Sequence, residues 1–128
     1  MYKYYQPNQK CKKACDCVIR ALTKACDAKW EDVYTRLCTI GLFMGDVPDA
    51  PDVYRKLLAD EGFEIHTIKV TKGSKRPTVK SFAKEHKKGT YVLEVANHVV
   101  TVVDGDYYDI WDCGDKCLYR YHEKVQEK

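Results

Sequence analysis

Three residues of this chain have the types and the order of a cysteine nucleophile with its base and its orienting group. Cys17 opens a predicted apolar helix, His98 opens a late strand, and Asp109 lies on the strand that follows. A thiol at a helix N-terminus is favoured as a thiolate, because unsatisfied N–H groups and the helix dipole stabilise negative charge there. A histidine held by a carboxylate can take the thiol proton. The combination predicts a small thiol hydrolase.

A predicted hairpin brings the histidine and the aspartate together. The pair Asp104-Gly105 is a strong signal for a two-residue hairpin loop. In that register Val103 pairs with Asp106, and His98 and Asp109 lie on one face as diagonal neighbours, about 7–8 Å apart. A carboxylate at this place could hold one ring nitrogen and leave the other for the thiol.

The same hairpin leaves one alternative open. Trp111 falls opposite His98 and would cover the contact between His98 and Asp109 from water. A slip of one residue or a bulge would reverse the faces and present Asp112 instead. Asp112 therefore stays as an alternative orienter.

The predicted first helix carries its nucleophile on the border of its apolar stripe. Asp16 is a good N-cap residue for it, and the stripe is centred on Val18 and Leu22, with Cys17 on its flank. That position suits a thiol that faces a groove. Arg20 is expected to be structural and to pair with an acidic group such as Asp46.

The order of elements predicts an α+β fold in one domain, residues 1–128. Helices are expected first, after an extended lead-in, and period-two segments follow them. The expected helices are 16–25, 30–40 (capped by Gly41), 51–60 and 78–88, and the expected strands are 63–70, 91–95, 98–103, 106–111 and 117–121. The predicted arrangement is N-terminal helices packed on a C-terminal antiparallel sheet.

Composition excludes several classes of protein. We expect no membrane span, because no run of about 18 apolar residues occurs. No secretory signal is visible, and a net charge of +3 is too near balance to favour nucleic acid. Seven cysteines are an odd number, so we expect reduced thiols in a cytoplasm and no disulfide framework.

Four of the cysteines suggest an alternative to catalysis. They form two equally spaced pairs, Cys11-x3-Cys15 and Cys113-x3-Cys117. Four thiolates suit a structural zinc ion, although zinc knuckles usually have two intervening residues. A small protein with a structural zinc held by these four cysteines is therefore the metal-binding alternative, and otherwise no metal or cofactor is expected.

Several motifs resemble the papain-like cysteine peptidase superfamily. Asp109-x-Trp111 resembles the Asn-x-Trp motif that orients the histidine in papain-type enzymes. Asp16-Cys17 and His98-Val99-Val100 resemble the bacteriocin-processing (C39-like) peptidases, in which the orienter is an aspartate. The chain is more similar still to small uncharacterised phage and prophage proteins of Firmicutes, over the segments 4–8, 16–21, 44–46, 98–102 and 105–112.

The resemblance implies a papain-like fold and a cysteine peptidase or amide hydrolase of phage origin. It implies Cys17 as nucleophile, His98 as general base and Asp109 as orienter, but it identifies no substrate. The expected partner is a peptide or protein substrate of the bacterial host, and peptide, isopeptide, peptidoglycan amide and thioester bonds all stay open. The resemblance also leaves open an inactive papain-like fold that binds a host factor.

Two departures from the family affect the expected oxyanion hole. Papain-type enzymes carry a glutamine before the nucleophile, and Cys11 stands at the matching position. Asn8, or else Gln9, must then supply the side-chain donor, with the backbone N–H of Cys17 as the second donor. C39-like enzymes usually have glycine after the nucleophile, where this chain has Val18.

Overall fold

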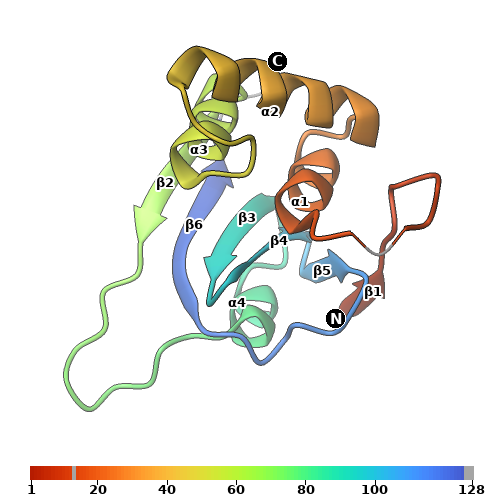
Figure 1. Cartoon of the computed structure of the whole chain (residues 1–128). Coiled ribbons are helices and arrows are strands. Elements are labelled where there is room, and N and C mark those ends of the chain that lie inside the picture. Colours follow the sequence, from red (N-terminus) through yellow and green to blue (C-terminus); the bar gives the residue numbers. More distant parts are fainter. Residues whose placement is uncertain (13, 126–128) are drawn as a thin grey trace.

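The computed structural model describes residues 1–12 and 14–125, and it is a six-stranded sheet with helices on both faces (Figure 1). The helices are α1 (Cys17–Ala25), α2 (Trp30–Met44), α3 (Pro51–Asp60) and α4 (Val79–Glu85). The strands are β1 (Tyr2–Tyr4), β2 (Phe63–Thr67), β3 (Thr90–Val95), β4 (His98–Val103), β5 (Asp106–Asp109) and β6 (Leu118–Lys124). No helix in the described ranges is long and apolar enough to cross a bilayer.

The sheet is mixed, whereas the sequence predicted an antiparallel one. Its strand order is β1-β5-β4-β3-β6-β2, and β1 runs parallel to β5 with Tyr2 beside Tyr107. The expected extended lead-in therefore contains the edge strand β1. The backbone groups of β1 pair with the N–H and C=O groups that β5 would otherwise expose. The mixed α/β composition with helices before most strands agrees with the prediction.

Two apolar cores lie on opposite faces of the sheet. One joins α1, α2 and α3 to the sheet through Val92 and Val99. The other joins α4 to alternate residues of the same strands, among them Leu93 and Val100. Because side chains alternate along a strand, β3 and β4 are buried on both faces, and Figure 1 shows α4 across the sheet from the other helices.

Helix α2 is one turn longer than predicted. Gly41 lies inside the helix, where a Cβ atom would stand 2.8 Å from the carbonyl oxygen of Asp46. Glycine is needed there because the following loop crosses the helix closely. The helix ends instead at Gly45, whose φ of 71° is the left-handed conformation of a C-terminal cap.

The predicted hairpin between β4 and β5 is confirmed. Asp104 and Gly105 both have positive φ, 50° and 86°, as a type I′ turn requires. Val103 pairs with Asp106, which is the predicted register. The turn thus determines which residues of β5 face which residues of β4.

A buried ion network links α3 to the centre of the sheet. The carboxylate of Glu94 accepts hydrogen bonds from Arg55 (Nη2, 2.6 Å) and His122 (Nε2, 2.7 Å). Burial raises the pKa of Glu94, but the bonds from His122 and Arg55 outweigh it and lower the pKa to about 2. The network therefore holds a charged carboxylate inside the fold.

Replacement of Glu94 by alanine is expected to destabilise the protein by about 3 kcal/mol, because the buried His122 ring and the Arg55 guanidinium then lose their hydrogen-bond partner. Urea unfolding at neutral pH measures this loss. The matched control is Lys56→Ala, which breaks an exposed pair with Asp60 and should cost about 0.5 kcal/mol or less. Equal losses in the two variants would show that the Glu94 network does not stabilise the fold.

Candidate active site

Helix α1 lies along β4 in a fixed register. The hydroxyl of Thr101 donates a 2.6 Å hydrogen bond to the carbonyl oxygen of Ala21, and the backbone N–H of Val99 donates to the Cys17 sulfur. Helix and strand therefore run in the same direction. Four helical residues rise about 6 Å and two strand residues about 6.6 Å. This match places Cys17, the first residue of α1, beside His98, the first residue of β4.

The Cys17 thiol is half-buried and carries a perturbed pKa. Burial raises its pKa, but a hydrogen bond with His98, the charge of His98, the Val99 N–H and the charge of Arg20 outweigh burial and lower it. The sulfur also belongs to the first turn of the helix, where N–H groups and the dipole favour negative charge. Its surroundings therefore favour the thiolate form of Cys17.

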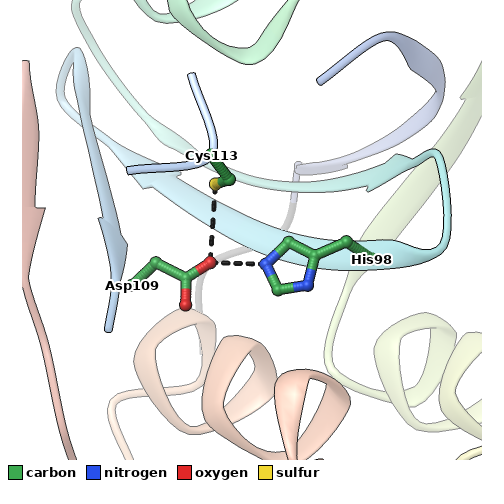
Figure 2. A group of neighbouring side chains, drawn as sticks. All are labelled: His98, Asp109 and Cys113. Atoms are coloured by element: carbon green, nitrogen blue, oxygen red, sulfur yellow. Dashed lines mark hydrogen bonds and ion pairs between the residues drawn. The ribbon is translucent and has the colours of Figure 1, made fainter. Parts of the chain in front are cut away.

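His98 is held between a carboxylate and the thiol. Its Nε2 lies 2.5 Å from Oδ2 of Asp109, which leaves Nδ1 for Cys17. Figure 2 shows the contact between His98 and Asp109. The His98 side chain is 7% exposed, and the Trp111 ring lies against it with centroids 5.0 Å apart. Burial lowers the pKa of His98, but the hydrogen bonds with Asp109, Cys113 and Cys17 outweigh it and raise the pKa. A raised imidazole pKa beside a lowered thiol pKa favours the ion pair at neutral pH.

Asp109 is 1% exposed, and its carboxylate is surrounded by hydrogen-bond partners. Arg20 Nε (3.0 Å) and the Ile110 N–H (2.7 Å) donate to Oδ1, and His98 Nε2 and the Cys113 thiol (3.4 Å) contact Oδ2. Burial raises the pKa of Asp109, but His98, Arg20 and Ile110 lower it overall. The carboxylate is thus charged and fixed in orientation.

Arg20 connects the site to the start of α2 through Asp16. The sequence analysis did not predict this connection. Its Nη1 lies 2.5 Å from Asp16, and Asp16 also accepts a 2.9 Å bond from the Trp30 indole. The predicted pairing of Arg20 with Asp46 is wrong, since Asp46 accepts instead from the N–H of the next residue. Asp16 and Arg20 are four residues apart on one helix face, a spacing that could have indicated their pairing.

The expected N-cap role of Asp16 is also wrong in part. Asp16 stands at the N-cap position, but its carboxylate faces Arg20 and Trp30. The first N–H groups of α1 are thus not occupied by this side chain. If a carbonyl carbon were attacked by the Cys17 sulfur, the resulting oxyanion would accept hydrogen bonds from these N–H groups.

Cys113, which the sequence suggested only as a zinc ligand, contacts the carboxylate of Asp109. It is buried against Asp109, and burial raises the pKa of its thiol, so it stays protonated and donates to the carboxylate. Among the described residues the structure groups Cys113 with His98 and Asp109, while Cys11, Cys15 and Cys117 are exposed, so the four cysteines of the zinc alternative are not gathered into one site. No signal in the sequence separates Cys113 from the other cysteines.

The same cluster has the atoms of a metal site. His98, Asp109 and Cys113 offer nitrogen, oxygen and sulfur atoms within 4.8 Å of one another (Figure 2). However, the guanidinium of Arg20 already binds this carboxylate and repels a second cation. We therefore interpret His98, Asp109 and Cys113 as a hydrogen-bonded cluster and not as a metal site.

The remaining predicted residues, Asp112 and Asn8, have hydrogen-bond partners other than His98. Asp112 accepts bonds from the Tyr107 hydroxyl (2.6 Å) and the Gly114 N–H (3.0 Å), so Asp109 and not Asp112 contacts His98. Asn8 is buried, and its side-chain oxygen accepts from the Lys10 N–H at 3.1 Å. The role of Asn8 in an oxyanion hole stays a prediction.

Two cavities flank the segment that leads into α1. One, of about 740 Å³, lies between residues 8–12 and α2, and Asn8, Trp30 and Tyr34 are among its lining residues. The other, of about 270 Å³, is lined in part by Asp16, Trp30 and Pro48. Asp16 thus joins the buried network to an apolar cavity that opens beside the N-terminus of α1.

Comparisons with protein-family models, with curated proteins and with solved structures gave no match.

Iodoacetamide is expected to alkylate Cys17 fastest among the cysteines at about pH 6, where an ordinary thiol is almost fully protonated. Cys113 should be protected, because it is buried and its pKa is raised. His98→Ala removes the hydrogen bond and the charge that oppose burial most strongly, so the pKa of Cys17 should rise and the rate should fall about tenfold for each unit of pKa gained. Mass spectrometry of each site over a pH series measures this.

The rate at Cys17 should therefore rise less steeply with pH around neutrality in the wild type than in His98→Ala. Cys117, which is exposed, is the reference thiol within the same molecule. A Cys17 rate that is unchanged by His98→Ala would contradict the pairing of thiol and imidazole.

Proposed function

We propose that this chain is a papain-like cysteine peptidase or amide hydrolase, with Cys17 as nucleophile, His98 as general base and Asp109 as orienter. One observation carries the proposal. The pKa of Cys17 is lowered by a hydrogen bond with His98, whose other ring nitrogen is held at 2.5 Å by a buried carboxylate. A thiol poised in this way differs from a structural cysteine, whose pKa burial raises.

Each side chain has one task in the proposed reaction. The Cys17 thiolate attacks the carbonyl carbon, and the carbonyl oxygen becomes an oxyanion. The imidazolium of His98 gives its proton to the leaving amine as the C–N bond breaks, which leaves a thioester on Cys17. His98 then takes a proton from water, the water attacks the thioester, and the thiol returns with release of the acid.

The proposed oxyanion hole uses the N-terminus of α1. The backbone N–H of Cys17 is one donor, supported by the direction of the Asp16 carboxylate away from these N–H groups. Asn8 is the proposed second donor, supported by its burial in the segment that leads into the helix. Donors fixed in place before the reaction stabilise the transition state more than the ground state.

The proposed substrate is a peptide or protein of a bacterial host, in line with the resemblance to phage proteins. Peptide, isopeptide, peptidoglycan amide and thioester bonds share the carbonyl carbon that this site would attack. The cavity of about 270 Å³ beside Asp16 is apolar for the most part and would receive a substrate side chain. The site needs no cofactor for this reaction.

The experiment is digestion of a peptide library prepared from a bacterial proteome, with mass spectrometry of the products. The wild type is expected to cleave a subset of peptides, and Cys17→Ala should lower the rate by about a thousandfold or more. Asp109→Asn should lower it by about a hundredfold or more, since the imidazole loses the charge that holds its proton.

Asp112→Asn is the matched control, because Asp112 binds Tyr107 and Gly114 and not His98. Its activity should stay near that of the wild type. Cleavage that survives in Cys17→Ala would contradict the proposal. So would a wild type that leaves peptide, isopeptide, peptidoglycan amide and thioester substrates uncut.

A further inference from the structure

The C-terminal end of α2 exposes an apolar surface that we call the α2 tip, made of Leu42, Phe43, Met44 and Val47. Leu42 is 84% exposed and Phe43 91% exposed, while Met44 and Val47 are 45% and 59% exposed. Isolated exposed apolar residues are common, but neighbouring ones in this number mark interaction sites. Figure 1 shows α2 on the outside of the helical layer.

The α2 tip is hollowed on one side. A groove of about 360 Å³ lies between α2 and α3, and Ile40, Phe43, Met44 and Lys56 are among its lining residues. Phe43 and Met44 thus belong both to the exposed surface and to the groove wall. Methionine and aromatic side chains adapt to an apolar partner and carry much of the binding energy of interfaces.

The charge around the α2 tip is acidic, in contrast to the rest of the chain. Residues 30–61 contain seven acidic and three basic residues, although the whole chain has a net charge of +3. The three basic residues are already paired, Arg36 with Glu61, Arg55 with Glu94 and Lys56 with Asp60. Residues 37–54 hold no lysine or arginine, and Asp46, Asp49 and Asp52 there are exposed.

This combination points to one kind of occupant. We propose that the α2 tip docks a basic amphipathic segment of another protein, which places apolar side chains on Leu42 and Phe43 and its lysines or arginines against Asp46, Asp49 and Asp52. An amphipathic helix in an apolar groove is a common mode of recognition. Complementary charge supplies the orientation and the rate of association.

Two other occupants fit the surface less well. A symmetric dimer through the α2 tip would bring the same acidic residues of both copies together, which costs binding energy. A membrane surface is disfavoured because anionic lipids repel Asp46, Asp49 and Asp52. A basic segment of a different protein is not repelled by Asp46, Asp49 and Asp52, unlike a second copy of this chain or an anionic membrane.

The loop that carries Val47 of the α2 tip also borders the cavity beside Asp16. Pro48 and Asp49, in the loop that carries Val47, line the cavity that also contains Asp16. The α2 tip and that cavity therefore share one loop. Binding at the α2 tip does not depend on catalysis by Cys17, so the docking proposal and the proposed function are tested independently.

The test uses a fluorescent helical peptide of leucine and lysine as the probe, with a leucine and glutamate peptide of the same apolar face as its counterpart. Anisotropy titrations of the full chain should show binding of the first peptide only, weakened by salt. The double variant Leu42→Ser/Phe43→Ser should bind at least about tenfold more weakly. The triple variant Asp46→Asn/Asp49→Asn/Asp52→Asn should lose most of the salt dependence.

Ile65→Ser is the matched control, because Ile65 is also exposed (46%) but lies on β2. Its affinity should equal that of the wild type, and all variants should keep the wild-type unfolding midpoint, since the altered side chains are exposed. Equal binding of both peptides, or unchanged affinity in the double variant, would overturn the proposal. A wild type that dimerises through Leu42 and Phe43 would overturn it in favour of a second copy, and binding to phosphatidylserine vesicles in favour of a membrane.

Discussion

The carboxylate of Asp109 is the interaction on which the site depends. It accepts hydrogen bonds from α1 through Arg20, from β4 through His98, and from the segment after β5 through Cys113. Three elements of the fold therefore meet at two oxygen atoms, and one of them, α1, is distant in sequence from the other two. A buried carboxylate that lacks a hydrogen-bond donor destabilises the folded state, so the folded protein is expected to keep these three donors in contact with Asp109.

Charges of opposite sign alternate through this part of the molecule. Asp16 faces Arg20, Arg20 faces Asp109, and Asp109 faces His98. Each group loses water on burial, and each regains a partner of opposite charge, which is the condition for burying ions at modest cost. The thiolate of Cys17 would end the series with a negative charge beside the imidazolium. This alternation explains why the pKa of Asp109 is lowered and that of His98 raised.

The helical layer serves two purposes in this account. Its inner side packs on the sheet through α1, which places Cys17 at the start of β4. Its outer side, at the α2 tip, is apolar and acidic where the remainder of the chain is basic. A single layer thus positions the proposed nucleophile and presents the proposed docking surface, and the cavity beside Asp16 lies between the two.

The sequence by itself determined the features that depend on near neighbours. The Asp104-Gly105 pair specifies the turn, and the turn specifies the register that puts Asp109 beside His98. The start of α1 at Cys17 follows from local pattern in the same way. Only the tertiary structure decided the pairing of β1 with β5, the end of α2 and the choice of Cys113 among the cysteines. Period and turn rules describe regular elements over a few consecutive residues. The pairing of β1 with β5 joins segments that about a hundred residues separate, and the other two features depend on how an irregular loop packs, which those rules do not describe. For that reason the sequence indicated the candidate residues but not the network that holds them.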